Sequence, residues 1–423
     1  MRRGKLLKTA GMILAAAMML TACGSSQTGS SEQTTKATDT ASTIEKNLAG
    51  LQGAESIALT QSDNYTDEYK TEVESSIYTY KTTDTQDSIS YIFISDIHLG
   101  KPDDNYSTEE VDAAVYRELY ALVDVANNTD IDFVCVGGDI QDGTSGDPDS
   151  KQIALNYLNK VSEILENCNK PVLILKGNHD DNSFSAQAQP DWLYDPAYII
   201  NNQEWYDATM SHFSQYATDY NNGYYYYDVP GKDIRVVCLN MSDSDDTVVD
   251  GKRNEIGMYF YGYKDAQIDW LLNSAMSRQD CQYVFLSHDA FDYPQGYGTD
   301  SNRDTLESIL NAATTHTAFS TDKFSKDFSE WTGEVQLYHC GHLHQERTIL
   351  SDEIGGIPLI NTDIGRAVNY FSVPQEWRDM QYEHLDGREL NTISEALFDI
   401  VISKSDQVNF IRFGNGDDWT LNK

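Results

Sequence analysis

The middle of the chain alternates short apolar runs with segments in which apolar residues recur at helical spacing. Three apolar runs predict buried strands, at residues 91–95, 133–136 and 172–176. The segment after the first run opens with a capping-box signature, Ser107 with Glu110, and keeps helical spacing to residue 126. The segment after the second run keeps it over residues 153–165. This order predicts a parallel sheet with helices on its faces, an α/β fold.

The second half of the chain is richer in strand patterns. Residues 181–222 form a loop-rich, aromatic insertion, which is either a lid or substrate wall or ordinary packing. A β-hairpin follows at 224–229 and 234–240, and its four consecutive tyrosines predict one buried and one solvated strand face. Residues 264–276 have the pattern of an amphipathic helix. Further strands are predicted at residues 348–350, 357–360, 393–403 and 408–413.

Residue types that bind metal ions follow five of the predicted strands. The strand at 133–136 runs into two glycines and Asp139, and strands at 283–287 and 335–340 run into histidines. The residues concerned are Asp96, His98, Asp139, Asn178, His179, His288, His342 and His344. Sites of open α/β sheets lie at the carboxyl ends of their strands. We therefore expect these side chains, which include five of the nine histidines, to share one site.

The set has the composition of a two-metal phosphoesterase site. Such a site needs two divalent ions about 3.5–4 Å apart, one bridging carboxylate, and several neutral nitrogen or oxygen donors. Each histidine alone is explained by a hydrogen bond inside the fold, but a structural role for the whole ordered set is not expected. The sequence favours a hydrolase over a non-catalytic surface binding lipoprotein whose metal site is structural.

The order of these motifs resembles the calcineurin-like metallophosphoesterase superfamily. Five blocks match its pattern: Asp96-Ile97-His98, Gly138-Asp139-Ile140-Gln141-Asp142, Gly177-Asn178-His179-Asp180, His288 and Gly341-His342-Leu343-His344. The resemblance covers residues 88–350. It implies a four-layer αββα sandwich, with two mixed sheets flanked by helices, and a metal-dependent phosphoric ester hydrolase.

By this resemblance, two divalent metal ions would share Asp139 as a bridging ligand. The other ligands of one ion would be Asp96, His98 and His344. Those of the second ion would be Asn178, His288 and His342. Mixed nitrogen and oxygen ligation fits Mn, Fe or Zn. A metal-bridging hydroxide would attack phosphorus in line, His179 would assist the leaving group, and Asp180 would either orient the ring of His179 or cap a helix.

Departures from the family patterns narrow the substrate class. Purple acid phosphatases have a tyrosine ligand where Asp142 stands, and Ser/Thr protein phosphatases have a phosphate-binding arginine where Gly143 stands. Asp180, in place of glutamate, is more similar to the small-molecule and cyclic-nucleotide phosphodiesterase branch. We expect a small phosphorylated substrate, with cyclic-nucleotide phosphodiesterase activity as the alternative. Arg303 and Arg366 are either phosphate contacts or members of surface salt bridges.

The charge of the chain is strongly acidic, with 67 acidic and 30 basic residues and a formal net charge of −37. A surface of this kind repels polyanions, so polymeric nucleic acid is not an expected partner. The charge does not exclude a small phosphorylated substrate, because bound metal ions would invert the local charge.

The first 22 residues resemble a bacterial lipoprotein signal peptide. Four basic residues precede a short apolar run at 12–20, and small residues precede Cys23. The run is shorter than the roughly 20 residues that a membrane-spanning helix needs. We expect cleavage before Cys23, a lipid on its sulfur, and an extracytoplasmic enzyme anchored to the bacterial membrane through this lipid.

The expected organisation has five parts. They are a signal peptide (1–22), a Ser/Thr-rich linker (23–43), an N-terminal segment of unknown role (44–87), a catalytic domain (88–370) and a β-rich segment that completes it (371–423). Within the segment of unknown role, alternation at residues 76–80 predicts an edge strand.

The five cysteines after Cys23 have no CxxC spacing, so a cysteine metal site is not expected. Cys135, Cys238 and Cys340 lie in apolar strand patterns and are predicted to be small buried hydrophobes. A disulfide between Cys168 and Cys281 is left open by the sequence, although we do not expect it.

Overall fold

The computed structural model describes residues 57–143, 146–187, 189–291, 299–367, 381, 383 and 385–423. The chain divides into two units, Met1–Gln52 and Gly53–Lys423, and every described residue lies in the second. The expected signal peptide, the lipidated Cys23 and the linker at 23–43 fall outside the described residues. Among the helices that are described, none has the length and apolar character needed to cross a membrane.

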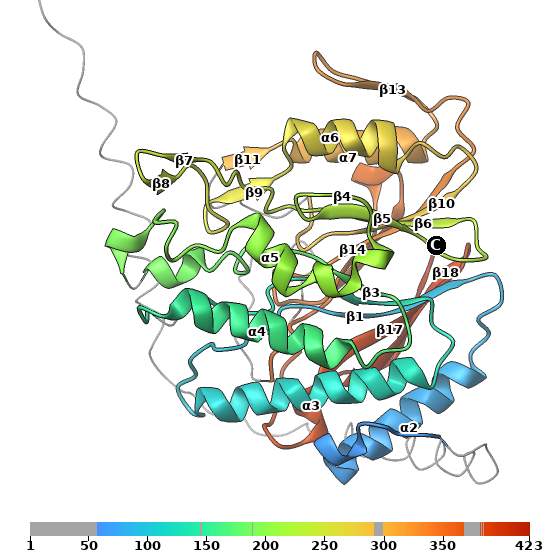
Figure 1. Cartoon of the computed structure of the whole chain (residues 1–423). Coiled ribbons are helices and arrows are strands. Elements are labelled where there is room, and N and C mark those ends of the chain that lie inside the picture. Colours follow the sequence, from blue (N-terminus) through green and yellow to red (C-terminus); the bar gives the residue numbers. More distant parts are fainter. Residues whose placement is uncertain are drawn as a thin grey trace, which may run out of the picture. The chain divides into compact units, whose positions relative to one another are not determined.

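Two large mixed sheets form the centre of the second unit (Figure 1). The first sheet has the order β19-β18-β17-β1-β2-β3, with β1 (Ile89–Ile94), β2 (Phe133–Val136), β3 (Val172–Ile174), β17 (Leu397–Ser403), β18 (Gln407–Gly414) and β19 (Trp419–Asn422). The second sheet has the order β15-β16-β14-β10-β6-β5-β4, with β4 (Thr218–Asn221), β5 (Tyr224–Asp228), β6 (Ile234–Cys238), β10 (Gln282–Leu286), β14 (Glu334–Cys340), β15 (Arg347–Ser351) and β16 (Ile357–Asn361). The predicted β1-β2-β3 series is parallel, and β17 pairs antiparallel with the free side of β1.

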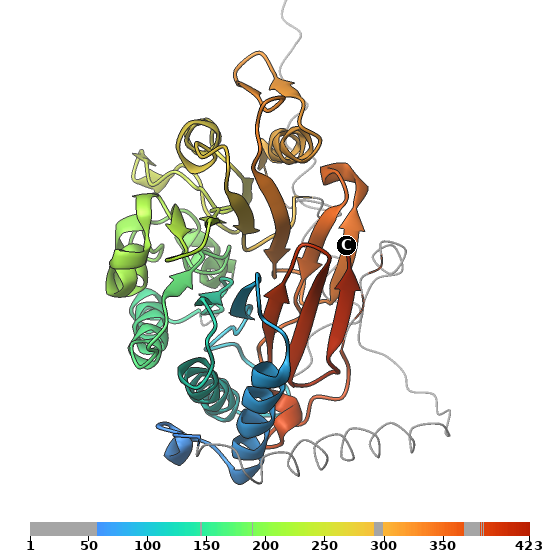
Figure 2. The same cartoon turned by 90° about the vertical axis from the view of Figure 1, so that its right-hand side faces the viewer.

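Helices pack on the outer faces of the two sheets. Against the first sheet lie α2 (Asp67–Thr82), α3 (Thr108–Asn127) and α4 (Ser150–Leu165), and α3 begins with the predicted capping box. Against the second sheet lie α6 (Asp265–Trp270), its π-helical continuation η5 (Leu271–Ala275) and α7 (Arg303–Thr314). Figure 2 shows α3 and α4 (teal) and α6 and α7 (yellow to orange) on opposite sides of the strands. The predicted αββα sandwich is confirmed.

The remaining elements are short. They are η1 (Ser62–Asn64), η2 (Ser183–Gln187), η3 (Pro190–Trp192), α5 (Asn202–Ala208), η4 (Met210–Tyr216), β7 (Val248–Val249), β8 (Lys252–Arg253), β9 (Phe260–Gly262), β11 (Thr299–Ser301), β12 (Ala318–Ser320), β13 (Ser325–Asp327), η6 (Asp352–Ile354) and η7 (Ile393–Glu395). Several of them belong to the insertion at 181–222, which is therefore more regular than the sequence suggests. Trp205 of this insertion is completely buried and serves packing.

Alternate residues of each central strand belong to two different cores. In β10, Tyr283 and Phe285 pack with α6 and α7, whereas Val284 and Leu286 join the core shared with the first sheet. Both faces of the strand are apolar because both are covered. The same arrangement corrects the expected solvated face at residues 224–227, where three of the four tyrosines are buried and the fourth is partly covered by Arg235, 3.7 Å above its ring.

The N-terminal segment is helical and is integrated into the fold, so the edge strand predicted at residues 76–80 is wrong. Thr66 caps α2, and the buried positions Tyr69, Val73, Ile77 and Tyr80 follow each other at intervals of three and four residues. Two of these positions, Ile77 and Tyr80, fall within 76–80, and they are three residues apart, which is helical and not strand spacing. The chain before α2 is fastened to α3 by the buried carboxylate of Asp124, which accepts hydrogen bonds from Thr60, Gln61 and Tyr65.

The five cysteines after Cys23 are free thiols, and all but Cys168 are buried. The open question of a Cys168–Cys281 disulfide is thereby answered, since neither sulfur is bonded to another. Cys135, Cys238 and Cys340 are small core residues, as predicted.

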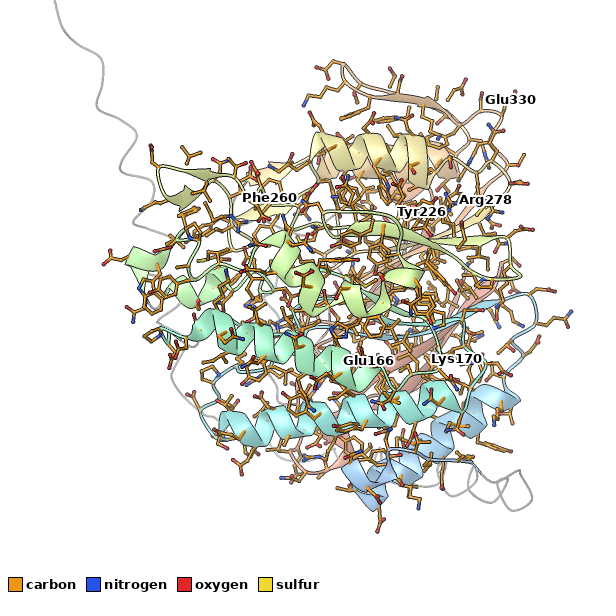
Figure 3. The ribbon with its side chains drawn as sticks, viewed as in Figure 1. Glu166, Lys170, Tyr226, Phe260, Arg278 and Glu330 are labelled. Carbon is orange, nitrogen blue, oxygen red and sulfur yellow. The ribbon has the colours of Figure 1, made fainter. Side chains whose placement is uncertain are left out.

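The parallel strands of both sheets point toward the same side of the molecule. Figure 3 labels Lys170, Arg278 and Glu330, which precede β3, β10 and β14, and all three lie on the right of the view or toward it. Phe260 of β9 lies on the left, on the side where the strands end. The carboxyl ends of five strands from two sheets can therefore contribute to one site.

Candidate metal centre

The metal-binding residue types converge from the two sheets. The segments after β1, β2 and β3 supply Asp96, His98, Asp139, Asn178 and His179, and those after β10 and β14 supply His288, His342 and His344. All are buried except the partly exposed His179 and His342. The residues that the strand pattern predicted to share one site therefore lie close together in the structure.

The first group of side chains consists of Asp96, His98, Asp139 and His344. The Nε2 atoms of His98 and His344 lie 2.9 Å apart, and the latter lies 3.2 Å from Oδ1 of Asp96. Nε2 of His98 lies 3.7 Å from Oδ2 of Asp139. Ligand atoms bonded at about 2.0–2.2 Å to one ion lie roughly 3–3.6 Å apart, so this group fits a divalent ion.

The second group consists of Asp139, His288 and His342, with the amide of Asn178 beside them. Nε2 of His288 lies 3.2 Å from Oδ2 of Asp139, 3.0 Å from Oδ1 of Asn178 and 3.3 Å from Nδ1 of His342. These distances fit a second ion with three nitrogen or amide ligands and one carboxylate.

One oxygen atom, Oδ2 of Asp139, belongs to both groups. The other carboxylate oxygen, Oδ1, accepts the backbone N–H of His179 at 2.8 Å. Asp96 is divided in the same way, because its Oδ2 accepts the backbone N–H of His342 at 2.8 Å while Oδ1 faces the histidines. Each carboxylate thus has one oxygen held by the backbone and one that faces histidine nitrogens.

The protonation of most of these groups suits metal binding, and His288 is the exception. Burial lowers the pKa of His98 to about 3 and that of His342 well below its ordinary value, so both rings are neutral, the form that binds metal. Burial opposes the ionisation of Asp96, but its hydrogen bond to a histidine holds its pKa below the usual range. At His288 burial acts against protonation, yet the carboxylate of Asp139 raises the pKa to about 10, and a metal ion has to displace this proton.

Polar contacts of the far ring nitrogens, hydrogen bonds at His288 and His179 and an ion-pair contact at His98, fix the direction of three histidines. Nδ1 of His288 donates to the carbonyl oxygen of Gly137 at 2.8 Å, which leaves Nε2 for the second ion. Nδ1 of His98 lies 3.1 Å from Oδ1 of Asp142, which leaves Nε2 for the first. Partners of this kind orient metal-binding histidines and raise their basicity. Nδ1 of His179 lies 2.6 Å from the carbonyl oxygen of Asp142.

The backbone at the site is held in an uncommon conformation. Asp96, His98, Asp139, His342 and His344 all have positive φ, between 43° and 71°. Non-glycine residues seldom adopt this region, and they concentrate at functional sites when they do. Glycine is required at 177 for another reason, because a Cβ there would lie 2.1 Å from Oδ1 of Asp139.

The contacts of Asp180 are not those expected of a residue that orients His179 or caps a helix. Its carboxylate accepts the backbone N–H groups of Asp139 (3.1 Å), Ile140 (2.9 Å) and Gly177 (2.8 Å), so it ties the loops after β2 and β3 together. The ring of His179 is oriented by the Asp142 carbonyl instead. Burial and the neighbouring Asp139 raise the pKa of Asp180 to about 6.

The two arginines considered as phosphate contacts are buried inside the fold. Arg303 donates to the carbonyl oxygens of Ala290 and Phe291, at 2.6 and 3.2 Å. Arg366 is 1% exposed and donates to the carbonyl oxygen of Lys101 at 3.3 Å. Both form ion pairs, Arg303 with Asp289 at 3.8 Å and Arg366 with Asp103 at 3.7 Å, but these pairs are largely buried and do not lie at the surface as expected. Both arginines thereby brace loops next to the site.

Sequence reasoning assigned no role to Asp142 or Lys101. Asp142 stands in the Gly-Asp-x-x-Asp block, which was the available signal, and its carboxylate lies 2.7 Å from Nζ of Lys101. Phe184 was also missed: its ring stacks on that of His179 with centroids 3.7 Å apart. No pattern in the sequence marks Lys101 or Phe184.

The model of the calcineurin-like phosphoesterase family matches residues 89–346. The chain belongs to this family. It is therefore a metal-dependent phosphoester hydrolase, a metallophosphoesterase. The family uses dinuclear metal centres, and this chain has Asp/His groups that are able to hold metal ions. No curated protein sequence matches this metallophosphoesterase.

Solved structures with a similar chain path include two phosphatases. A dimetal phosphatase from Danio rerio is 16% identical, and the match covers 79% of this chain and 98% of that one, with a TM-score of 0.44. A purple acid phosphatase from yellow lupin (Lupinus luteus) seeds is 11% identical, with 79% and 54% covered and a TM-score of 0.42. At these TM-scores the likeness adds nothing to the family match and the site geometry.

Proposed function

We propose that this metallophosphoesterase binds two divalent ions, Mn, Fe or Zn, and hydrolyses a small phosphoester with the help of His179. The first ion is assigned to Asp96, His98, Asp139 and His344. The second is assigned to Asp139, Asn178, His288 and His342. The observation that carries the proposal is the position of Asp139 Oδ2, which lies 3.7 Å from a nitrogen of one group and 3.2 Å from a nitrogen of the other.

The bound ions would supply Lewis-acid polarisation of the phosphoryl group and activation of a water molecule for in-line attack. The residues of the chain provide the rest. Asp139 and Asp96 keep their charged oxygens directed inward because backbone N–H groups hold the other oxygens. The burial of these carboxylates excludes bulk water, which strengthens their interaction with cations.

His179 is suited to proton transfer to the leaving oxygen. Its Nδ1 donates to the Asp142 carbonyl, so Nε2 is the ring nitrogen left to exchange a proton with a substrate. Nε2 lies 3.9 Å from Oδ2 of Asp139, beside the first group, and the side chain is 13% exposed, which lets a substrate reach it. Phe184 covers one face of the ring and limits its rotation.

Metal content and three substrates test this function. The full chain in detergent is expected to hold two Mn²⁺ per molecule and to cleave p-nitrophenyl phosphate or bis(p-nitrophenyl) phosphate. Preference for the diester together with hydrolysis of 3′,5′-cAMP would select the cyclic-nucleotide phosphodiesterase alternative. One ion or none, with no turnover of any of the three, would refute the dinuclear hydrolase.

We also propose that the enzyme is extracytoplasmic and membrane-anchored through a lipid on Cys23. The support is the sequence alone: the basic start, the short apolar run and the small residues before Cys23. Wild-type protein is expected to partition into detergent, and Cys23→Ser into the aqueous phase. Equal partitioning of the two would contradict lipidation.

A further inference from the structure

Lys101 forms a buried ion pair at the edge of the metal centre. Its Nζ lies 2.7 Å from Oδ1 of Asp142, and the two side chains are 8% and 1% exposed. Buried charges of opposite sign depend on each other, because removing one leaves the other unpaired in a medium of low dielectric constant. The position of the Asp142 carboxylate is therefore tied to that of the ammonium group.

Asp142 in turn contacts two histidines of the site through different atoms. Its Oδ1 lies 3.1 Å from Nδ1 of His98, and its carbonyl oxygen lies 2.6 Å from Nδ1 of His179. One residue thus sets the ring direction of a ligand assigned to the first ion and of the residue assigned to the leaving group.

The backbone around this pair is held independently of the ion pair. The N–H of Asp142 donates to the carbonyl oxygen of Leu99 at 3.0 Å, and the N–H of Lys101 donates to that of His98 at 3.2 Å. Arg366 donates to the carbonyl oxygen of Lys101 at 3.3 Å. Substitution of the lysine side chain would leave these bonds in place and would act mainly on the Asp142 carboxylate.

We propose that Lys101 is a positioning residue of the metal centre, which acts through Asp142 on His98 and, through the same residue, on His179. The inference rests on the proposed function, since it takes His98 to be a ligand of the first ion. Without the ammonium group, the carboxylate loses its paired position and no longer holds Nδ1 of His98. Loss of such an outer partner typically lowers metal affinity by about 10–100-fold.

Titration calorimetry of the full chain with Mn²⁺ tests the proposal without using activity. A His342→Ala variant identifies the binding event of the second ion. Lys101→Met is expected to weaken the first event by about 10–100-fold and to leave the second unchanged. Lys101→Arg, which keeps the cation, is expected to restore most of the affinity.

Three further variants make the outcome decisive. Lys232→Met is the matched control, because Lys232 also pairs with a carboxylate at 2.7 Å, that of Asp132 before β2. It is expected to leave both binding events unchanged. Asp142→Asn is expected to weaken binding of the first ion as much as Lys101→Met does. The double variant Lys101→Met/Asp142→Asn is expected to bind the first ion no more weakly than Asp142→Asn alone.

Unchanged first-ion affinity in Lys101→Met, or effects that add in the double variant, would overturn the proposal. If Lys101→Met does not fold, as judged by circular dichroism, unchanged first-ion affinity in Asp142→Asn would overturn it instead. Failure of the proposed function has a different signature, because the wild-type chain itself would then not show two binding events.

Discussion

Replacing Asp139 by asparagine tests the shared ligand atom directly. The N–H of His179 can only donate, so in Asp139→Asn the amide oxygen has to stay at the position of Oδ1, 2.8 Å from it. The NH₂ group then replaces Oδ2, the atom 3.2 Å from His288 Nε2 and 3.7 Å from His98 Nε2. Its two hydrogens point to both ion positions. We expect both ions to be lost, and not only one.

The size of the effect follows from binding linkage. An ion at 100 times its dissociation constant stabilises the folded state by about 2.7 kcal/mol, so two such ions contribute about 5.4 kcal/mol. Unfolding entropy of about 2.1 cal/mol/K per residue gives roughly 0.8 kcal/mol/K for a unit the size of Gly53–Lys423. Saturating Mn²⁺ is therefore expected to raise the midpoint temperature of thermal unfolding of the wild-type chain by roughly 7 °C. It is expected to leave the midpoint of Asp139→Asn unchanged.

Thermal unfolding with and without Mn²⁺, together with metal content, measures this difference. Comparing the Mn²⁺-dependent shift removes the effect of the substitution on the metal-free fold. Asp132→Asn is the control, because Asp132 also accepts a backbone N–H at 2.8 Å, that of Ser90, at the other end of β2. It is expected to keep the full shift. A normal shift, or one retained ion, in Asp139→Asn would refute the shared-ligand geometry.

Three other substitutions have defined outcomes. His179→Ala is expected to keep both ions and to lower kcat by about 10²–10⁴-fold, most for esters with poor leaving groups; a drop in metal content would make His179 a ligand. Asp180→Ala removes the acceptor of three loop N–H groups, so urea unfolding is expected to show a free energy of unfolding lower by about 3 kcal/mol or more. A decrease of less than about 1 kcal/mol would contradict that role. Asp124→Ala is expected to open residues 57–66 to proteolysis while kcat stays unchanged; an intact segment would show that other contacts hold it.

The strand ends and ligand types were predictable because both are local. An apolar run followed by Asp139 or by His288 identifies a strand end and a ligand residue from a few neighbouring residues. The convergence of His98 with His344 across 246 positions of sequence followed only from the rule that parallel strands end at one edge. Resemblance to a family supplied the division into two ligand sets.

The failures concern contacts that depend on the path of a loop. The pairing of Lys101 with Asp142 joins residues 41 positions apart and has no local signature. Asp180 was interpreted from its neighbour His179, but the turn directs its carboxylate to the backbone of the other loop. The positive φ of the ligand residues likewise comes from the surrounding structure, which holds them in a conformation that their residue types do not favour.

The pairing of β1 with β17 determines when the metal centre can form. Ile89 at the start of β1 lies opposite Ser403, so the strand that leads to Asp96 has one open edge until the residues of β17 have been made. Contacts so distant in sequence form late in folding. The ions would then be taken from the compartment in which the chain completes its fold, which for an exported chain is not the one in which synthesis begins. For a chain that is exported as we propose, the metal supply outside the cytoplasm would decide which element the enzyme carries.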